Sequence, residues 1–295
     1  MPSTMPQQQA PLAIDALSRG DALSAMLASH LAAVGAVAVA QAEIDRAAEW
    51  VCAALTAGKT LYYAAAGSSG LMALADASEL AGTFGIPTQQ VRVRMAGGVP
   101  ADGVMPGDTE DDAGDGIAAA REMQPGDVAI VVSASGTTPY AVGFAETARE
   151  QGNGVVAIAN VAGSRLFQCA DVAIAIPTAA EVVEGSTRLG AATAQKVALN
   201  MISTQAGILL GHVHDGMMVN LIADNAKLRQ RASGIVRRIA RVPQAAAEAA
   251  LSASGHDAKL AVLLACGVDI DRARERLARA GGRLRDCLPG RNGET

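Results

Sequence analysis

Two short segments rich in glycine and hydroxyl side chains hold the most evident chemistry of this sequence. The first is Gly-Ser-Ser-Gly at residues 67–70, and the second is Ser-Ala-Ser-Gly-Thr-Thr at residues 133–138. Each follows a short apolar run and opens a segment with helical spacing. Backbone N–H groups at a helix N-terminus, together with small hydroxyls, can hold a phosphate without lysine or arginine. We therefore predict a sugar-phosphate pocket whose binding residues are Gly67, Ser68, Ser69, Gly70, Ser133, Ser135, Gly136, Thr137 and Thr138.

A third polar cluster, which contains Glu181, Ser186 and Thr187, precedes a long apolar segment. We add these three residues to the predicted substrate-binding set, because carboxylates and hydroxyls before a helix can orient sugar hydroxyls. The alternative for all three segments is helix capping, since serine is favoured at the N-cap. Two loops at equivalent places favour ligand binding, and the second loop has more hydroxyls than capping needs.

Two carboxylates near these segments are candidates for acid–base chemistry. Glu79 lies three residues after Asp76, on the helix that the first loop opens. Glu110 lies within the acidic run 108–112, in a long segment rich in Gly, Asp and Pro. A carboxylate beside a pocket can act as a general acid or base. By composition alone, the first pair is typical of a helix surface, and the acidic run of a solvated loop or a helix cap.

Other residue types indicate no further site. The four cysteines include no CxxC pair, so neither zinc nor a disulfide framework is predicted. His212 and His214 have no evident companion ligands, and we predict no metal and no cofactor. The arginines between 229 and 241 form the only basic cluster, which is typical of a solvated helix face, so we predict no nucleic-acid partner.

The elements that must position these residues alternate between strand and helix. Strands are expected at 60–65, 89–95, 127–132, 154–159 and 171–176, and helices at 71–80, 116–123, 139–151 and 187–210. This order predicts an α/β fold with an open, doubly wound, mainly parallel sheet of the flavodoxin-like kind. Ligands bind such sheets at the carboxyl ends of the strands, where both loops fall.

The rest of the chain suggests three parts. Residues 1–20 are expected to form a disordered tail, 21–228 a sugar-phosphate-binding domain that starts with helices, and 229–295 a small helical domain. Half of the 295 residues are apolar and the net charge is −5. No signal peptide or run of about 18 apolar residues is evident, so we expect a cytoplasmic protein without a membrane partner.

Three blocks of the sequence resemble the signatures of one enzyme family. Residues 66–70 with 76–79, residues 133–140, and residues 181–189 with 192–196 are similar to those of N-acetylmuramic acid 6-phosphate etherases, which belong to the sugar isomerase (SIS) domain superfamily. The resemblance covers roughly residues 60–288. It implies an SIS-type fold, a homodimer, a phosphorylated amino sugar as ligand, and no cofactor.

The resemblance also implies a reaction. Such a lyase cleaves the lactyl ether to give N-acetylglucosamine 6-phosphate and D-lactate by elimination and hydration, as part of peptidoglycan recycling within carbohydrate metabolism. The family's catalytic acid falls on Glu79 and its second catalytic glutamate on Glu110.

The chain departs from the family pattern at three cations. Leu71, Thr137 and Gly190 stand where the family usually has arginine, arginine and lysine, so this is a divergent member. Two alternatives therefore stay open: an isomerase or lyase that acts on another phosphorylated amino sugar, and a non-catalytic sugar-phosphate sensor. The retained Glu79 and Glu110 argue against the sensor.

Overall fold

A five-stranded parallel sheet forms the centre of the protein. The computed structural model describes residues 13–223 and 225–288, and its strands follow the order β2-β1-β3-β4-β5. All four neighbouring pairs are parallel. This order is that of flavodoxin-like sheets and confirms the predicted fold class. The strands are β1 (Leu61–Ala65), β2 (Val91–Met95), β3 (Val128–Ser133), β4 (Gly154–Ala159) and β5 (Val172–Ala175).

The central strands are apolar because helices cover both faces of the sheet. Every residue of β1 and β3 is buried, as expected of a parallel sheet that meets no solvent. Asp127 fixes the relative start of these two strands, since its carboxylate accepts hydrogen bonds from the backbone N–H groups of Thr60 and Gln124.

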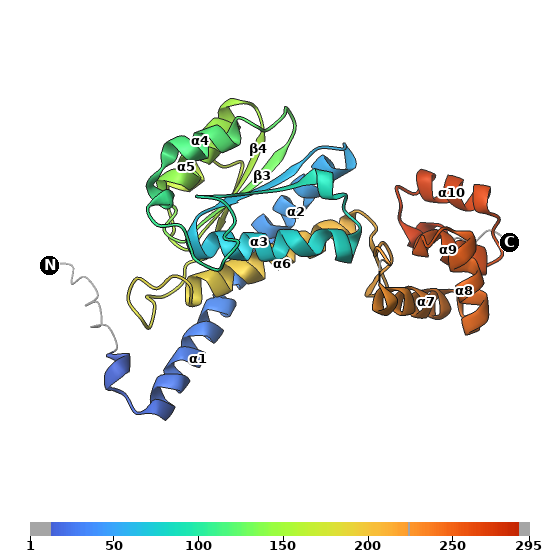
Figure 1. The fold of residues 1–295 in the computed structure, drawn as a ribbon, viewed down its shortest axis with the longest axis horizontal. Coiled ribbons are helices and arrows are strands. Elements are labelled where there is room, and N and C mark those ends of the chain that lie inside the picture. Colours follow the sequence, from blue (N-terminus) through green and yellow to red (C-terminus); the bar gives the residue numbers. More distant parts are fainter. Residues whose placement is uncertain (1–12, 224, 289–295) are drawn as a thin grey trace, which may run out of the picture.

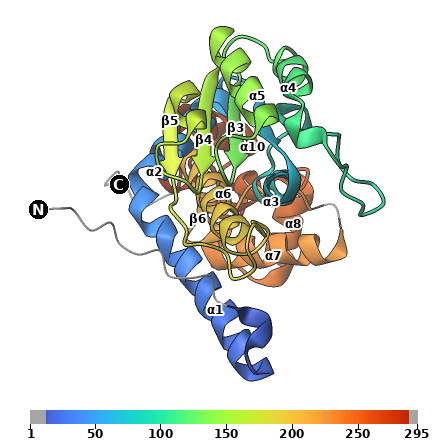
Figure 2. The ribbon, with the colours of Figure 1, turned by 90° about the vertical axis from the view of Figure 1, so that its left-hand side faces the viewer.

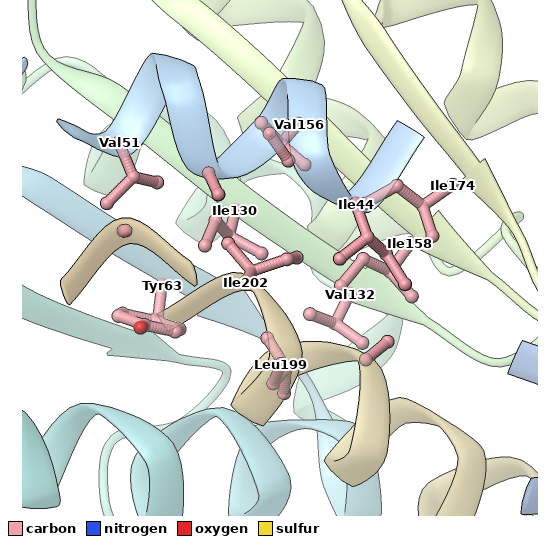
Figure 3. Close-up of a cluster of buried hydrophobic side chains, with 14 of the residues drawn as sticks. Ile44, Val51, Tyr63, Ile130, Val132, Val156, Ile158, Ile174, Leu199 and Ile202 are labelled. Carbon is pink, nitrogen blue, oxygen red and sulfur yellow. The ribbon is translucent and has the colours of Figure 1, made fainter. Parts of the chain in front are cut away.

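Three helices cover one face: α2 (Gln41–Thr56), α3 (Gly67–Phe84) and α6 (Gly190–Leu209). Their apolar faces meet the sheet in one cluster, part of which Figure 3 shows with Ile44 and Val51 of α2 beside Leu199 and Ile202 of α6. On the other face, α4 (Ala113–Ala120) and α5 (Pro139–Glu150) pack against a second cluster. The two helical layers are on opposite sides of the sheet in Figure 1.

The first helix, α1 (Arg19–Ala36), projects from the body of the molecule (Figures 1 and 2). Ser18 caps it by accepting a hydrogen bond from the N–H of Asp21. Residues 1–12 of the predicted tail lie outside the described residues, whereas Ile14–Ala16 form a turn of 3-10 helix and α1 already begins at Arg19. The stretch Arg19–Thr56 is long and apolar enough to cross a bilayer, and 11% of its most apolar 18-residue window is buried, whereas its second half, α2, packs on the sheet.

The C-terminal part is helical and has its own apolar core. Its helices are α7 (Ala226–Ala240), α8 (Gln244–Ala253), α9 (Ala258–Ala265) and α10 (Ile270–Arg279). They surround a separate buried cluster at the end of the molecule opposite α1 (Figure 1). A two-stranded hairpin, β6 (Val213–His214) with β7 (Met217–Met218), precedes them and does not appear among the predicted elements.

Candidate functional site

A cavity of about 350 Å³ opens beside the carboxyl ends of β1 and β3. It brings together nine of the predicted site residues: Gly67, Ser68, Ser69, Glu110, Ser133, Ser135, Thr137, Thr138 and Thr187. Its remaining lining residues are Ala66, Asp111, Val132, Ala134, Pro139 and Gly185. Gly70, Glu79, Gly136, Glu181 and Ser186 are not among them.

The first loop is the opening turn of α3 itself. The predicted helix start at residue 71 is late, because α3 begins at Gly67, whose φ of 55° favours glycine. Gly70 packs closely against Met95 at the end of β2, because a Cβ at this position would lie 2.8 Å from Cγ of Met95. The small residues of this segment therefore let α3 start directly above the strand ends.

The second loop is held in shape by its own hydroxyls. Ser133, which is buried, accepts a hydrogen bond from the Gly136 N–H at 3.0 Å and shares one of 2.8 Å with the Thr138 hydroxyl. Ser135 accepts hydrogen bonds from the N–H and the hydroxyl of Thr137, and both residues are exposed. Gly136 is structural, because a Cβ there would lie 2.2 Å from Oγ of Ser164.

Two helix N-termini supply the positive potential of the cavity. α3 starts at Gly67 and α5 at Pro139, and both residues line it. Each helix N-terminus carries about half a positive charge and unpaired N–H groups. The described lining residues include no lysine or arginine. An anion in this cavity would thus meet neutral donors and helix dipoles.

Glu110 lies beside the first loop. It belongs to a 3-10 turn, Thr109–Asp111, and its Oε2 atom is 3.8 Å from the place where a Cβ of Gly67 would be. Asp108 precedes this turn with a left-handed φ of 57°. Asp112 follows it and caps α4, because its carboxylate accepts a hydrogen bond from the Asp115 N–H. The structure thus places a carboxylate within a few ångströms of the predicted phosphate loop.

Glu181 has another partner in the structure. Its two carboxylate oxygens accept hydrogen bonds of 2.8 and 2.9 Å from the N–H groups of Gly190 and Ala191, the first residues of α6. The Glu181 carboxylate therefore already binds the N–H groups at the N-terminus of α6, where an anionic ligand could otherwise bind. Of the third cluster, only Thr187 lines the cavity, and Gly185 joins it there.

Glu79 is exposed on the fourth turn of α3 and is not among the residues that line the cavity. Its neighbour Asp76 is buried and accepts hydrogen bonds from Tyr63, Asn200 and Ser203 at 2.8, 2.6 and 2.9 Å. Within one chain, the two candidate catalytic glutamates are thus separated. Among residues 13–223 and 225–288, no group of three His, Cys, Asp or Glu side chains is placed to hold a metal ion.

Sequence reasoning missed one polar residue of the cavity and one polar contact between α1 and α6. Asp111, next to Glu110, lines the cavity, and only its place in the acidic run could have indicated this. His30 of α1 contacts the hydroxyl of Thr193 through Nδ1 at 3.1 Å. Because Thr193 donates its own proton to the Leu189 carbonyl, the His30 ring must donate from Nδ1. No spacing in the sequence links these two residues.

Comparison with known proteins identifies relatives over most of the chain. Residues 25–160 match the SIS domain family. An N-acetylmuramic acid 6-phosphate etherase of Deinococcus radiodurans is 38% identical over 278 residues, which are 93% of this chain and 91% of that protein. One of Symbiobacterium thermophilum is 43% identical and covers 76% of each chain.

A solved structure supports the fold. A protein of Bacteroides fragilis, assigned as a phosphosugar isomerase involved in capsule formation, aligns with a TM-score of 0.51 and 17% identity, and the match covers 68% of this chain and 95% of that one. At this identity the likeness concerns the fold alone.

Proposed function

The chain belongs to the family of N-acetylmuramic acid 6-phosphate etherases, and we propose that it is such a carbon–oxygen lyase. It cleaves the lactyl ether of N-acetylmuramic acid 6-phosphate to give N-acetylglucosamine 6-phosphate and D-lactate. The observation that carries this proposal is the cavity in which a carboxylate, Glu110, stands beside two hydroxyl-rich helix starts.

The phosphate end of the substrate fits the neutral donors of the cavity. The N-termini of α3 and α5 offer unpaired N–H groups, and Ser68, Ser135 and Thr137 offer hydroxyls. These groups bind a dianion through hydrogen bonds and helix dipoles. Thr187 and the backbone at Gly185 also line the cavity, where they would meet the sugar.

The reaction needs a base and an acid. In the ring-opened sugar, a base removes the proton from C2, beside the aldehyde, and an acid protonates the ether oxygen on C3 as the C3–O bond breaks. Lactate leaves, and water then adds to the double bond at C3. We assign the base to Glu110, because it lies at the cavity, and the acid to Glu79, in keeping with the family resemblance.

The proposal extends to the state of the enzyme in the cell. We propose a homodimer that works in the cytoplasm in peptidoglycan recycling. The exposed leucines of α1 support a dimer, because a long apolar stripe on a helix is typical of an interface.

The first test is to incubate the purified protein with N-acetylmuramic acid 6-phosphate and to measure D-lactate. We expect lactate from the wild type and from Glu150→Gln, a control at an exposed carboxylate of α5. We expect about a thousandfold less from Glu110→Gln, which keeps the shape but not the base. No lactate, together with thermal stabilisation by N-acetylglucosamine 6-phosphate, would instead favour the two alternatives, an enzyme that acts on another phosphorylated amino sugar or a sensor.

A further inference from the structure

The C-terminal helices carry a charge opposite to that of the rest of the chain. Between residues 226 and 288 the sequence has 13 lysines and arginines against 6 aspartates and glutamates, a net charge of +7, although the whole chain carries −5. α7 contributes most to this excess, because it contains five basic residues and no acidic one. An excess of one sign on one part of a protein attracts ligands of the other sign. This part of the chain is therefore suited to an anionic ligand.

A cavity of about 590 Å³ opens on this basic part of the chain, and we call it the C-terminal cavity. Its walls come from the hairpin β6–β7, the end of α7 and the residue after α9. The volume lies in the range of about 300–1,000 Å³ that is usual for small-molecule sites. Thr187 of the cavity at the strand ends precedes α6, and the hairpin follows α6, which is about 30 Å long. The two cavities are therefore separate sites.

Two arginines that line the C-terminal cavity have no partner within the part of the chain that the structure describes. Neither the Arg238 nor the Arg241 guanidinium donates a hydrogen bond or forms an ion pair there. Asp215, the carboxylate among the described lining residues, is already bonded to Arg285 at 2.6 Å. The C-terminal cavity thus has an excess of positive charge.

Arg241 has a backbone conformation that favours glycine. It ends α7 with a φ of 57° and a ψ of 43°, in the left-handed region. Helices often end with glycine in this conformation, because a Cβ makes it costly. The dipole of α7 accounts for the basic residues of its last turn, Arg237 and Arg238. It does not account for an arginine where the backbone favours glycine, whereas a ligand bound by the guanidinium does.

The rest of the lining combines a buried imidazole with apolar side chains. His214 is 3% exposed, and its Nε2 lies 3.6 Å from Oδ2 of Asp215. Apolar surface comes from Met217, Ile239 and Leu288. Arginine binds phosphate through paired N–H groups, and apolar walls accommodate the organic part of a small ligand. This combination of lining residues suits an organic phosphate.

We propose that the C-terminal cavity is a second ligand site, which binds a small phosphate monoester through Arg238 and Arg241. The phosphate accepts hydrogen bonds from both guanidiniums, and the organic part lies against the apolar wall. This site is separate from the reaction at the strand ends, so its test needs no lactate assay. Cys266, a partly exposed free thiol of the cavity wall, reports on the site, because a bound ligand covers it.

Protection of Cys266 from alkylation tests the site. The full chain is treated with N-ethylmaleimide at about pH 8.5, because burial raises the pKa of the Cys266 thiol and the thiolate is the form that reacts. Peptide mass spectrometry follows the labelling with glucose 6-phosphate, with inorganic phosphate and with glucose. At ten times its Kd, glucose 6-phosphate should slow the labelling about tenfold, and inorganic phosphate should do so at higher concentration, whereas glucose should not.

Cys52 of α2 is the internal control, since it is also a partly exposed free thiol but lies outside the C-terminal cavity. Its labelling should be the same in every sample. If neither glucose 6-phosphate nor inorganic phosphate protects Cys266 at any concentration, no phosphate site exists there. Protection by a DNA duplex but by neither small phosphate would show a surface for polyanions, and it would also overturn the small-molecule site.

Arginine variants separate the two cavity residues from the general positive charge. Arg238→Gln/Arg241→Gln should lose the protection of Cys266 and keep the far-UV spectrum of the wild type, since both arginines are exposed. Arg237→Gln is the matched control, because Arg237 is also exposed and adjoins Arg238 but does not line the C-terminal cavity. It should keep the protection. An equal loss in both variants would mean that the ligand responds to overall charge, against a defined site.

Arg241→Gly separates a ligand-binding role from a structural one. Glycine suits the left-handed φ, so the denaturant midpoint should stay equal or rise. One of the two guanidiniums is lost, so glucose 6-phosphate should bind about tenfold more weakly. A lower midpoint with unchanged protection would make Arg241 a structural residue and would overturn its part in the site.

Discussion

At the scale of single residues, the cavity differs from the family pattern in its lack of cations. The second loop has Thr137 at a place where the family usually has arginine, and Thr137 is exposed at the cavity. A guanidinium there would form charge-assisted hydrogen bonds with a phosphate, which contribute about 1.5–3 kcal/mol each.

We therefore expect Thr137→Arg to lower the KM for N-acetylmuramic acid 6-phosphate about tenfold, with kcat almost unchanged. The gain should shrink as salt is raised, because an exposed charge is screened. Thr137→Gln, which is long but neutral, is the control and should not gain affinity. An equal gain for both variants would show that length rather than charge is the cause.

Single residues also show which parts of the site could be predicted from the sequence and which could not. The resemblance and the loop pattern predicted Gly67, Ser68, Ser69 and the hydroxyls of the second loop, and the structure brings these to one cavity. Glu181 was predicted as a sugar ligand, but it caps α6 from nine residues away. Such a contact depends on the path of the chain between 181 and 190, which local spacing does not encode.

At the scale of elements, Asp76 joins three parts of the site's frame. Its carboxylate links α3 to Tyr63 of β1 and to Asn200 and Ser203 of α6. Tyr63 and Asp76 are both buried. Burial raises the pKa of the Tyr63 hydroxyl well above its usual value, and the neighbouring Asp76 carboxylate raises this pKa further. Tyr63 therefore donates to Asp76 throughout the physiological range of pH.

Asp76→Ala should reduce the free energy of unfolding by about 3 kcal/mol, because the buried hydroxyls of Tyr63 and Ser203 and the half-buried amide of Asn200 lose this acceptor. Denaturant unfolding measures this as a lower midpoint. Ser78→Ala, on the exposed side of the same helix, is the control and should change the midpoint little, since its hydroxyl bonds the Leu74 carbonyl within α3 itself. A similar loss in both variants would contradict the role given to the network.

The elements themselves were largely predictable. Continuous apolar runs such as 127–132, bounded by turn residues, favour buried parallel strands, and the structure has β3 at Val128–Ser133. The hairpin β6–β7 was missed because its strands have two residues each, too few for a periodic pattern. The start of α3 was placed late because two glycines within four residues usually indicate a turn.

At the scale of the whole molecule, His212 lies where the end of α6 meets the C-terminal helices. Burial lowers the pKa of His212 to about 4, and the positive charge of Lys259 adds to this, while the Phe84 carbonyl opposes it. Lys259 is itself buried and donates to the Gly282 carbonyl. The junction thus contains two basic side chains, and protonation of His212 would add a second positive charge beside that of Lys259.

This junction should make the fold sensitive to acid. Between pH 6.5 and about 4 the unfolded chain takes up a proton at His212 and the folded chain does not, so stability falls as the pH falls. The contribution is on the order of 3 kcal/mol over this range. We expect His212→Gln to flatten the pH dependence of unfolding between about pH 7 and 4.5. His256→Asn, at an exposed histidine, should leave the slope as in the wild type.

The apolar stripe of α1 also affects the order of events during synthesis. α1 ends at residue 36 and α6, the helix that its second half contacts, ends at residue 209, so 173 residues are added after α1 before α6 is complete. At about 5–20 residues per second, the ribosome needs roughly 9–35 s to add them. Throughout this interval the nascent chain exposes the leucines of α1, as the finished chain also does. Pairing on the ribosome would shield the stripe from aggregation before the second chain is complete.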